Sequence, residues 1–132
     1  MAMPSSVKTK TDLMYTSHCP WDNACQGKDK RVLFVCSAGL LRSATAARIY
    51  ANKYNTRCAG SYEYALVPVS DNLILWAQEI VFVNKENYDY VSKRYDLSDH
   101  VVKILDIPDI YNHMDKRLIK AFEEQYEPVY RY

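Results

Sequence analysis

The sequence predicts an α/β fold of three layers, in which a four-stranded parallel sheet is flanked by helices on both faces. Two observations lead to this prediction. Short apolar runs rich in β-branched and aromatic residues recur along the chain, which is typical of strands buried in a parallel sheet. Segments with apolar residues at helical spacing alternate with these runs, and such alternation favours parallel strands joined by covering helices.

Four segments have the composition of a buried strand. In chain order they cover residues 32–35, 56–59, 80–83 and 101–105, and Gly60 ends the second segment. Ligands of open parallel sheets bind outside the carboxyl ends of the strands. The loops that follow these segments are therefore where we look for chemistry.

Four further segments have the pattern of a helix. Apolar residues recur at helical spacing over residues 44–54 and again over residues 88–95. Between these two segments, Ser70 and Asp71 form an N-cap region, and Asp115 is the expected N-cap of a last helix. The inner face of that last helix consists of Leu118, Ile119, Phe122 and Tyr126.

The chain length predicts a single domain. With 132 residues, the chain is long enough to bury one core of its own. Residues 1–30 are polar and show no sustained periodicity, so we expect them to form a partly mobile N-terminal extension. Residues 31–132 are expected to form the domain.

Composition excludes several functional classes. With 17 Lys and Arg residues against 16 Asp and Glu, the net charge of +1 indicates no nucleic-acid or membrane partner. No stretch reaches the roughly 18 apolar residues of a spanning helix, and no signal-peptide core is present, so a cytoplasmic location is expected. The three glycines, Gly27, Gly39 and Gly60, cannot supply a G-x-G-x-x-G or Walker phosphate loop.

The four cysteines are Cys19, Cys25, Cys36 and Cys58. In a reducing compartment we expect thiols or catalytic groups rather than disulfides. His18 lies beside the first two cysteines, but this spacing matches no common zinc pattern. We therefore expect neither a metal site nor a cofactor.

The loop after the first predicted strand has the strongest chemical signal. It reads C-x5-R-S and joins a buried strand to a helix. Successive backbone N–H groups of such a loop, together with the N-terminus of the helix, bind anions. The residues expected to hold a phosphate are Cys36, Ser37, Ala38, Gly39, Leu40, Leu41, Arg42 and Ser43.

The side chains of this loop suit nucleophilic attack on phosphorus. The positive potential of an anion-binding loop favours a thiolate at its edge, and the Ser43 hydroxyl can stabilise that of Cys36 further. The planar fork of Arg42 binds two phosphate oxygens, and Gly39 supplies the positive φ that a tight loop needs. We therefore expect Cys36 to accept a phosphoryl group, which water then releases.

This strand, loop and helix resemble the active-site segment of the low-molecular-weight protein tyrosine phosphatases. The resemblance covers residues 31–126 and includes C-A-G-S at 58–61 and L-D-I-P-D-I-Y at 105–111. It is closest to a bacterial-type branch with an I-P-D-x-Y acid loop. It implies the low-molecular-weight phosphatase fold and a hydrolase that acts on phosphotyrosine proteins or small aryl phosphates.

The chain departs from the family pattern at three points. Gly39 stands where the family often has an Asn in the left-handed conformation, and Leu41 stands where it often has a second cysteine. In the acid loop, the proline comes before Asp109 rather than after it.

The resemblance also implies a general acid on the loop after the fourth strand, where it would protonate the leaving phenolate oxygen. Asp109 keeps the Asp-x-Tyr spacing of the family and is the expected acid, with Asp106 as the alternative. Tyr111 would form one wall of the substrate pocket. Tyr62 or Tyr64 would form the opposite wall.

Other functions remain open. Residues 36–39 also resemble the cysteine loop of IIB phosphocarrier domains, which pass on a phosphocysteine and need no acid, so Arg42 and Asp109 favour the phosphatase. A catalytically weak phosphotyrosine-binding module would have the same loop. A thiol-dependent arsenate reductase would need downstream resolving cysteines, and only Cys58 follows Cys36. The oligomeric state is not predicted.

Overall fold

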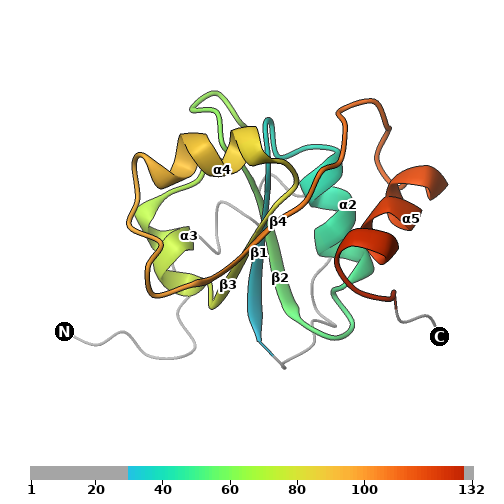
Figure 1. Cartoon of the computed structure of the whole chain (residues 1–132), viewed down its shortest axis with the longest axis horizontal. Coiled ribbons are helices and arrows are strands. Elements are labelled where there is room, and N and C mark those ends of the chain that lie inside the picture. The colour runs from blue at the N-terminus through green and yellow to red at the C-terminus, as the bar shows by residue number, and fades with distance from the viewer. Residues whose placement is uncertain (1–29, 130–132) are drawn as a thin grey trace.

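The structure is a computed structural model that describes residues 30–129. It has the predicted α/β fold, with a central sheet between two layers of helices (Figure 1). Strands and helices alternate along the chain. Their bounds are β1 Arg31–Cys36, α2 Arg42–Ile49, β2 Asn55–Gly60, α3 Asp71–Trp76, β3 Glu79–Phe82, α4 Lys85–Ser92, β4 Val101–Ile104 and α5 Lys116–Gln125.

Some predictions fall outside the described residues. These are the N-terminal extension, apart from Lys30, and the candidate metal ligands His18, Cys19 and Cys25. Within residues 30–129, no group of three or more His, Cys, Asp or Glu side chains is arranged to hold a metal ion. In the same part of the chain, no helix is both long enough and apolar enough to cross a membrane.

The sheet has the strand order β2-β1-β3-β4, and all its neighbouring strands are parallel. After β1 the chain moves outward to β2, and it then crosses back to place β3 on the other side of β1. The direction of winding therefore changes between β1 and β3, which is the point where such sheets bind ligands beyond the carboxyl ends of their strands. The loop after β1 lies at this point.

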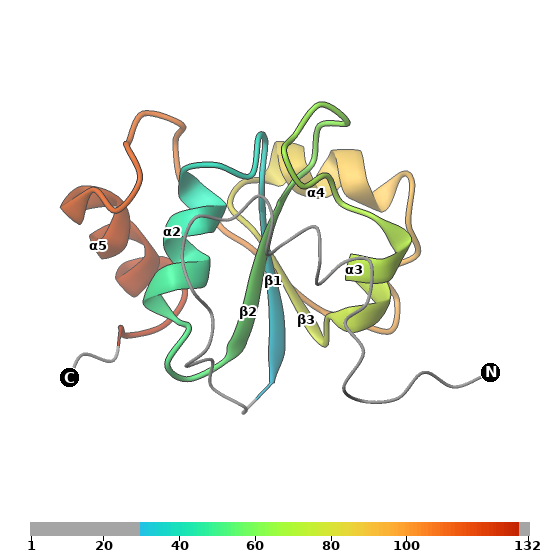
Figure 2. The same cartoon turned by 180° about the vertical axis from the view of Figure 1, so that it is seen from behind.

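The two faces of the sheet have separate cores. Helices α2 and α5 cover one face and α3 and α4 cover the other, as both views show (Figures 1 and 2). Because side chains alternate along a strand, Phe34 of β1 packs on the α2 face, where its ring stacks on that of Tyr50 at 5.7 Å. Leu33 packs on the opposite face with Leu73 of α3.

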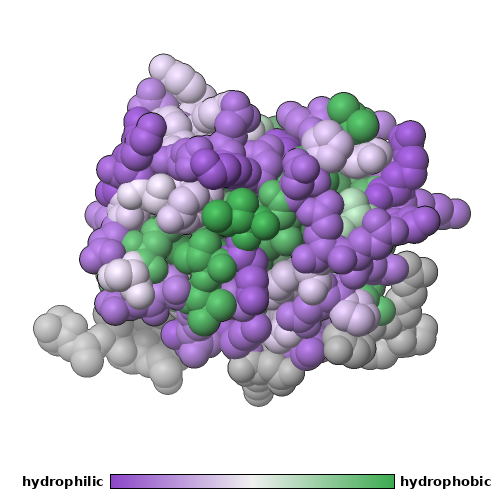
Figure 3. Space-filling view, in the orientation of Figure 1, coloured by the Kyte–Doolittle hydropathy of each residue, from purple (hydrophilic) through white to green (hydrophobic). Residues whose placement is uncertain are grey.

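The fourth strand differs from the buried strand that its composition predicted. β4 lies at the edge of the sheet, with Val101 54% exposed and Ile104 45% exposed. Figure 3 has the orientation of Figure 1, in which β4 crosses the front of the molecule, and it shows apolar side chains gathered across the middle of this view. The exposed Lys103, between Val101 and Ile104 in β4, places a charge on the open edge of the sheet, which opposes pairing with a strand of another chain.

Two helices are shorter than the spacing of apolar residues predicted. α2 ends at Ile49, and Tyr50 and Tyr54 follow it in a turn. The Tyr54 hydroxyl donates to Glu127 Oε1 at 2.6 Å, so this residue packs by tertiary contact rather than on a helix face. Tyr95 likewise lies beyond the end of α4.

The predicted N-caps are confirmed. Ser70 Oγ accepts a hydrogen bond from Leu73 N at 3.3 Å at the start of α3. Asp115 Oδ1 accepts one from Arg117 N at 2.8 Å at the start of α5. Both bonds satisfy a backbone donor that the first turn of a helix leaves free.

Candidate active site

The loop over residues 36–43 places a cysteine sulfur among hydrogen-bond donors. Cys36 is the last residue of β1 and is 3% exposed. Its Sγ accepts a bond from Gly39 N at 3.1 Å and lies 3.0 Å from Ser43 Oγ. The backbone N–H of Gly39 donates to the sulfur, whereas in the contact with Ser43 either the sulfur or the hydroxyl oxygen can be the donor.

Two glycines allow this loop to pack against the end of β2. Gly39 has φ +74°, as its role in the sequence predicted, and a Cβ there would lie 2.7 Å from Gly60 N. Gly60 pairs with Cys36 across the sheet, and a Cβ at Gly60 would lie 2.7 Å from Ser37 O. Any other residue at either position would push the phosphate loop away from β2.

The helix that follows the loop begins without a side-chain cap. Leu41 is the N-cap of α2 and makes no capping hydrogen bond, and the first turn contains no acidic residue. By contrast, Ser70, Asn84 and Asp115 cap the other three described helices. The first N–H groups of α2 and the positive end of its dipole therefore act at the loop.

Arg42, the first residue of α2, is buried, with 2% of its surface exposed. Its Nη1 donates to Ile107 O at 3.0 Å, and its Nη2 donates to Ser37 Oγ at 3.3 Å. Its Nε lies 3.6 Å from Asp109 Oδ1. The guanidinium thus connects the phosphate loop to the loop after β4, and its partners offset part of the free energy of burying a cation.

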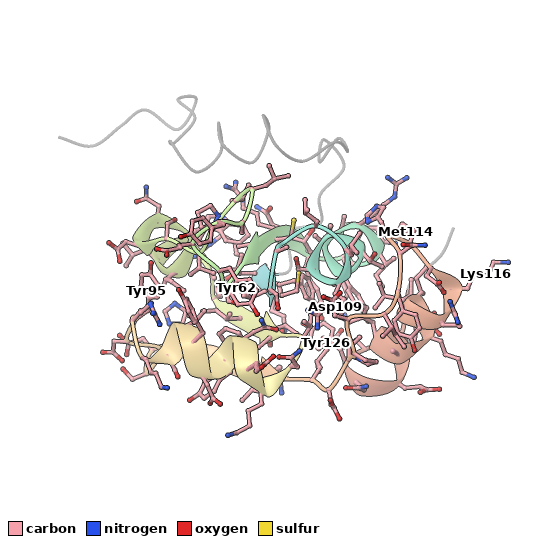
Figure 4. The ribbon with its side chains drawn as sticks, turned by 90° about the horizontal axis from the view of Figure 1, so that it is seen from above. Tyr62, Tyr95, Asp109, Met114, Lys116 and Tyr126 are labelled. Atoms are coloured by element: carbon pink, nitrogen blue, oxygen red, sulfur yellow. The ribbon has the colours of Figure 1, made fainter. Side chains whose placement is uncertain are left out.

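The two candidate acids have different surroundings. The side chain of Asp109 is 63% exposed and reaches toward Arg42. Asp106 is held to α5 through its backbone, because its N–H and C=O bond to the Gln125 side chain at 2.6 and 2.9 Å. Figure 4, which views the carboxyl edge of the sheet, has Asp109 near the centre of that edge. Of the two carboxylates, Asp109 is the one that forms an ion pair with Arg42, and its role as the acid stays a prediction.

The three tyrosines proposed as pocket walls differ in their exposure and in their contacts. Tyr62 N donates to Ser37 O at 3.1 Å, which ties the residue to the phosphate loop, and its ring is 49% exposed. Tyr64 extends into solvent with 91% of its surface exposed. Tyr111 is half-buried, and the Arg117 guanidinium lies 5.2 Å from the centre of its ring. All three roles stay predictions, and that of Tyr62 has the most direct support.

Asn87 is a site residue that the sequence reasoning missed. It lies on α4, is 1% exposed, and its Nδ2 donates to Ser37 Oγ at 3.2 Å and to Ser61 Oγ at 3.0 Å. Ser61 N in turn donates to Cys36 O at 2.7 Å. A signal was available, since Asn87 precedes Val91 by four residues and so lies on the same inward face of the helix.

The loop after β4 also docks on α2. Met114 has φ 62°, unusual for a residue other than glycine, and its N–H bonds to Thr45 Oγ1 at 2.8 Å. His113 Nδ1 lies 3.4 Å from the same Oγ1. Burial and the nearby Arg48 lower the pKa of His113, while a hydrogen bond with the Leu41 backbone opposes them. The imidazole is therefore held in its neutral form against the start of α2.

Comparison with known proteins supports the fold. The chain is similar to the solved structure of YwlE arginine phosphatase from Geobacillus stearothermophilus, with a TM-score of 0.57 and 18% sequence identity over 73% of this chain and 85% of that chain. A scan against protein-family profiles and a search of curated protein sequences found no match. At this identity the likeness establishes the fold, which is the low-molecular-weight phosphatase fold expected from the sequence.

Proposed function

We propose that this protein is a phosphatase that hydrolyses phosphotyrosine or aryl phosphate esters through a phosphocysteine intermediate. The observation that carries the proposal is the position of Cys36 Sγ. This sulfur accepts a hydrogen bond from Gly39 N at 3.1 Å and lies 3.0 Å from Ser43 Oγ. Arg42, which bonds to Ser37 of the same loop, and the uncapped N-terminus of α2 supply positive charge at this loop. The phosphatase fold of the structural neighbour supports the same class of reaction.

In the first step, the Cys36 thiolate attacks phosphorus. A sulfur–phosphorus bond forms while the bond from phosphorus to the phenolic oxygen breaks. Arg42 and the loop N–H groups bind the equatorial oxygens, which stabilises a loose transition state. Asp109, in its protonated form, gives its proton to the leaving oxygen, so the phenol departs neutral.

In the second step, water attacks the phosphocysteine. The Asp109 carboxylate left by the first step takes a proton from the water, whose oxygen bonds to phosphorus as the sulfur–phosphorus bond breaks. Inorganic phosphate and the Cys36 thiolate are the products. Ser43 stabilises the departing sulfur, from which its hydroxyl oxygen lies 3.0 Å.

The loop after β4 favours this reaction over a phosphocarrier or a simple binding module. A carrier does not need a carboxylate to protonate a leaving group, whereas Asp109 lies 3.6 Å from the phosphate-binding arginine. A second candidate substrate is phosphoarginine, because the structural neighbour is an arginine phosphatase. The same nucleophile and acid would serve, since a guanidine also leaves more readily when it is protonated.

The test is steady-state hydrolysis of p-nitrophenyl phosphate and of peptides that contain phosphotyrosine, phosphoserine, phosphothreonine or phosphoarginine. We expect turnover of the aryl phosphate and of phosphotyrosine. Cys36→Ser should lower turnover by at least about 10³-fold while vanadate still binds, and Arg42→Ala should weaken both. Substantial turnover by Cys36→Ser would contradict the covalent mechanism, and stable phosphocysteine without hydrolysis would indicate the carrier.

A further inference from the structure

A cavity of about 320 Å³ lies between the segment that follows β2 and helix α4. Tyr90 and Arg94 line it from α4 and the turn beyond it, and Ser61, Glu63 and Val69 line it from the opposite segment. None of these residues takes part in the proposed reaction. The volume is enough for one large side chain of a bound polypeptide.

The cavity adjoins the phosphate loop. Ser61 belongs to its lining and donates its N–H to Cys36 O at 2.7 Å. The ring of the next residue, Tyr62, meets that of Tyr90 edge-on, with centroids 6.2 Å apart. In Figure 4, Tyr62 lies between Asp109 and Tyr95, another residue of the lining. A peptide that leaves the site across Tyr62 therefore runs toward the cavity.

Internal contacts hold the cavity open. The Tyr95 hydroxyl donates to Val69 O at 3.2 Å, which joins its two walls. The Arg94 guanidinium lies 3.7 Å from the centre of the Tyr90 ring, and its Nη1 donates to Tyr90 O at 3.0 Å. These contacts place the exposed Arg94 side chain against the Tyr90 side of the cavity.

Two charged side chains of the lining, Arg94 and Glu63, bear on the charge of a ligand that the cavity would bind. Within residues 30–129, Arg94 has no carboxylate partner, so the rest of its planar fork faces other ligands. The other charged group of the lining, Glu63, lies on an exposed segment with no ion pair in the same part of the chain. Both side chains are exposed, but Arg94 contacts Tyr90 at the cavity through its guanidinium, which favours an anion over a cation as the ligand.

Resting on the proposed phosphatase function, we infer that this cavity is a substrate subsite for an acidic side chain. The subsite binds the carboxylate of a Glu or Asp within three residues of the phosphorylated residue of a substrate protein. Arg94 binds the carboxylate, and the Tyr90 and Tyr95 rings contact the aliphatic part of the side chain. Glu63 weakens this binding by like-charge repulsion.

The experiment uses phosphotyrosine peptides with alanine flanks, in which each position within three residues of the phosphotyrosine is in turn Glu, Gln or Lys. For the best position, we expect kcat/KM with Glu to exceed that with Gln by about threefold to tenfold, mostly through KM. Arg94→Gln should remove this preference and leave the Gln peptide unchanged. Glu63→Gln should increase the preference. Lys93→Gln, a neighbouring exposed cation outside the lining, should keep it.

Hydrolysis of p-nitrophenyl phosphate, which has no flanking residues, is measured for every variant and should not change. If wild-type protein hydrolyses this ester but shows no preference for Glu at any position, the subsite is refuted and the phosphatase stands. Equal loss of the preference in Arg94→Gln and Lys93→Gln would also refute it, since that result indicates general attraction. If wild-type protein hydrolyses neither ester nor peptide, the proposed function fails, and the subsite with it.

Discussion

The end of the sheet where its strands begin, the amino edge, and the end where they finish, the carboxyl edge, each bury one charged side chain, but the two side chains are paired differently. At the amino edge, Glu79 is 3% exposed, lies 3.1 Å from Lys30 Nζ and accepts a hydrogen bond from the Tyr126 hydroxyl. At the carboxyl edge, Arg42 is 2% exposed, and its carboxylate partner, Asp109, lies 3.6 Å away and is largely in solvent. The first arrangement neutralises its charge, whereas the second pairs a buried cation with an exposed carboxylate, as the proposed binding of an anionic substrate requires.

The phenols of the amino edge are kept neutral. Burial and then Glu79 raise the pKa of Tyr126 well above its usual range. Burial, with the hydrogen bond to Glu127, raises the pKa of Tyr54 to about 12. Both groups therefore remain donors throughout the ordinary pH range. On the proposed function, the amino edge serves stability and the carboxyl edge serves chemistry, and each prediction below tests one side of this comparison.

The largest expected effect is at the carboxyl edge. Asp109→Asn should lower turnover of phosphotyrosine by about 10²–10⁴-fold, since its phenolate needs a proton, and should affect a strongly activated nitrophenyl ester far less. The measurement is kcat on both substrates, with circular dichroism as a check on folding. Asp106→Asn is the matched control and should change little. If Asp106→Asn shows the leaving-group-dependent loss instead, the two roles are reversed.

Gly39→Ala should harm both activity and stability. The new Cβ would meet Gly60 N at 2.7 Å while the backbone keeps a positive φ, so the loop must move. We expect a loss of about 1–3 kcal/mol in the free energy of unfolding and at least about a tenfold loss of turnover. Urea unfolding and steady-state assays measure the two effects. Leu40→Ala, at an exposed neighbouring position, should keep the wild-type unfolding free energy.

Tyr126→Phe tests the amino edge. It removes one partner of the buried Glu79, so the free energy of unfolding should fall by about 1–3 kcal/mol, while kcat of the folded protein stays the same. Urea unfolding measures the change. Tyr64→Phe is the control, since Tyr64 is 91% exposed and should be neutral. A loss of turnover without a loss of stability would show that the two edges are coupled.

The smallest expected effect is a pH dependence at His113. Since the pKa of His113 is lowered in the folded state, the unfolded state binds more protons near pH 6. Stability should therefore fall as the pH drops through the ordinary histidine value of about 6.5. His113→Gln should reduce the fall in Tm measured between pH 7.5 and 5.5. An unchanged pH profile in this variant would contradict the assignment.

Much of the site was predictable because its parts are close together in the chain. The apolar run of β1, the cysteine and arginine spacing and the start of α2 all lie within residues 31–49. The positive φ of Gly39 was predicted because a tight loop between a strand and a helix needs one, and the structure has φ +74° there. The N-caps Ser70 and Asp115 were equally local features.

The predictions were less accurate where the surroundings of a residue were inferred from the composition of its segment. The fourth strand was expected to be buried because it is apolar, yet Val101 is 54% exposed at an unpaired edge. Tyr126 was expected on the inner face of the last helix, and its ring does pack against that core, but it lies one residue beyond the end of α5, and its hydroxyl bonds to Glu79, 47 residues away. Neither strand order nor a buried pair between distant residues can be read from local spacing.

By itself, the sequence determined the order of strands and helices. It also predicted the loop over residues 36–43 as the candidate site at the carboxyl edge of the sheet, because short-range spacing and strand direction control these features. Tertiary structure alone decided which distant groups support that loop. Asn87 bonds to Ser37 across 50 residues, and Asp109 approaches Arg42 only when β4 lies beside β3. Such contacts depend on how whole elements pack, and no local pattern of residues encodes that packing.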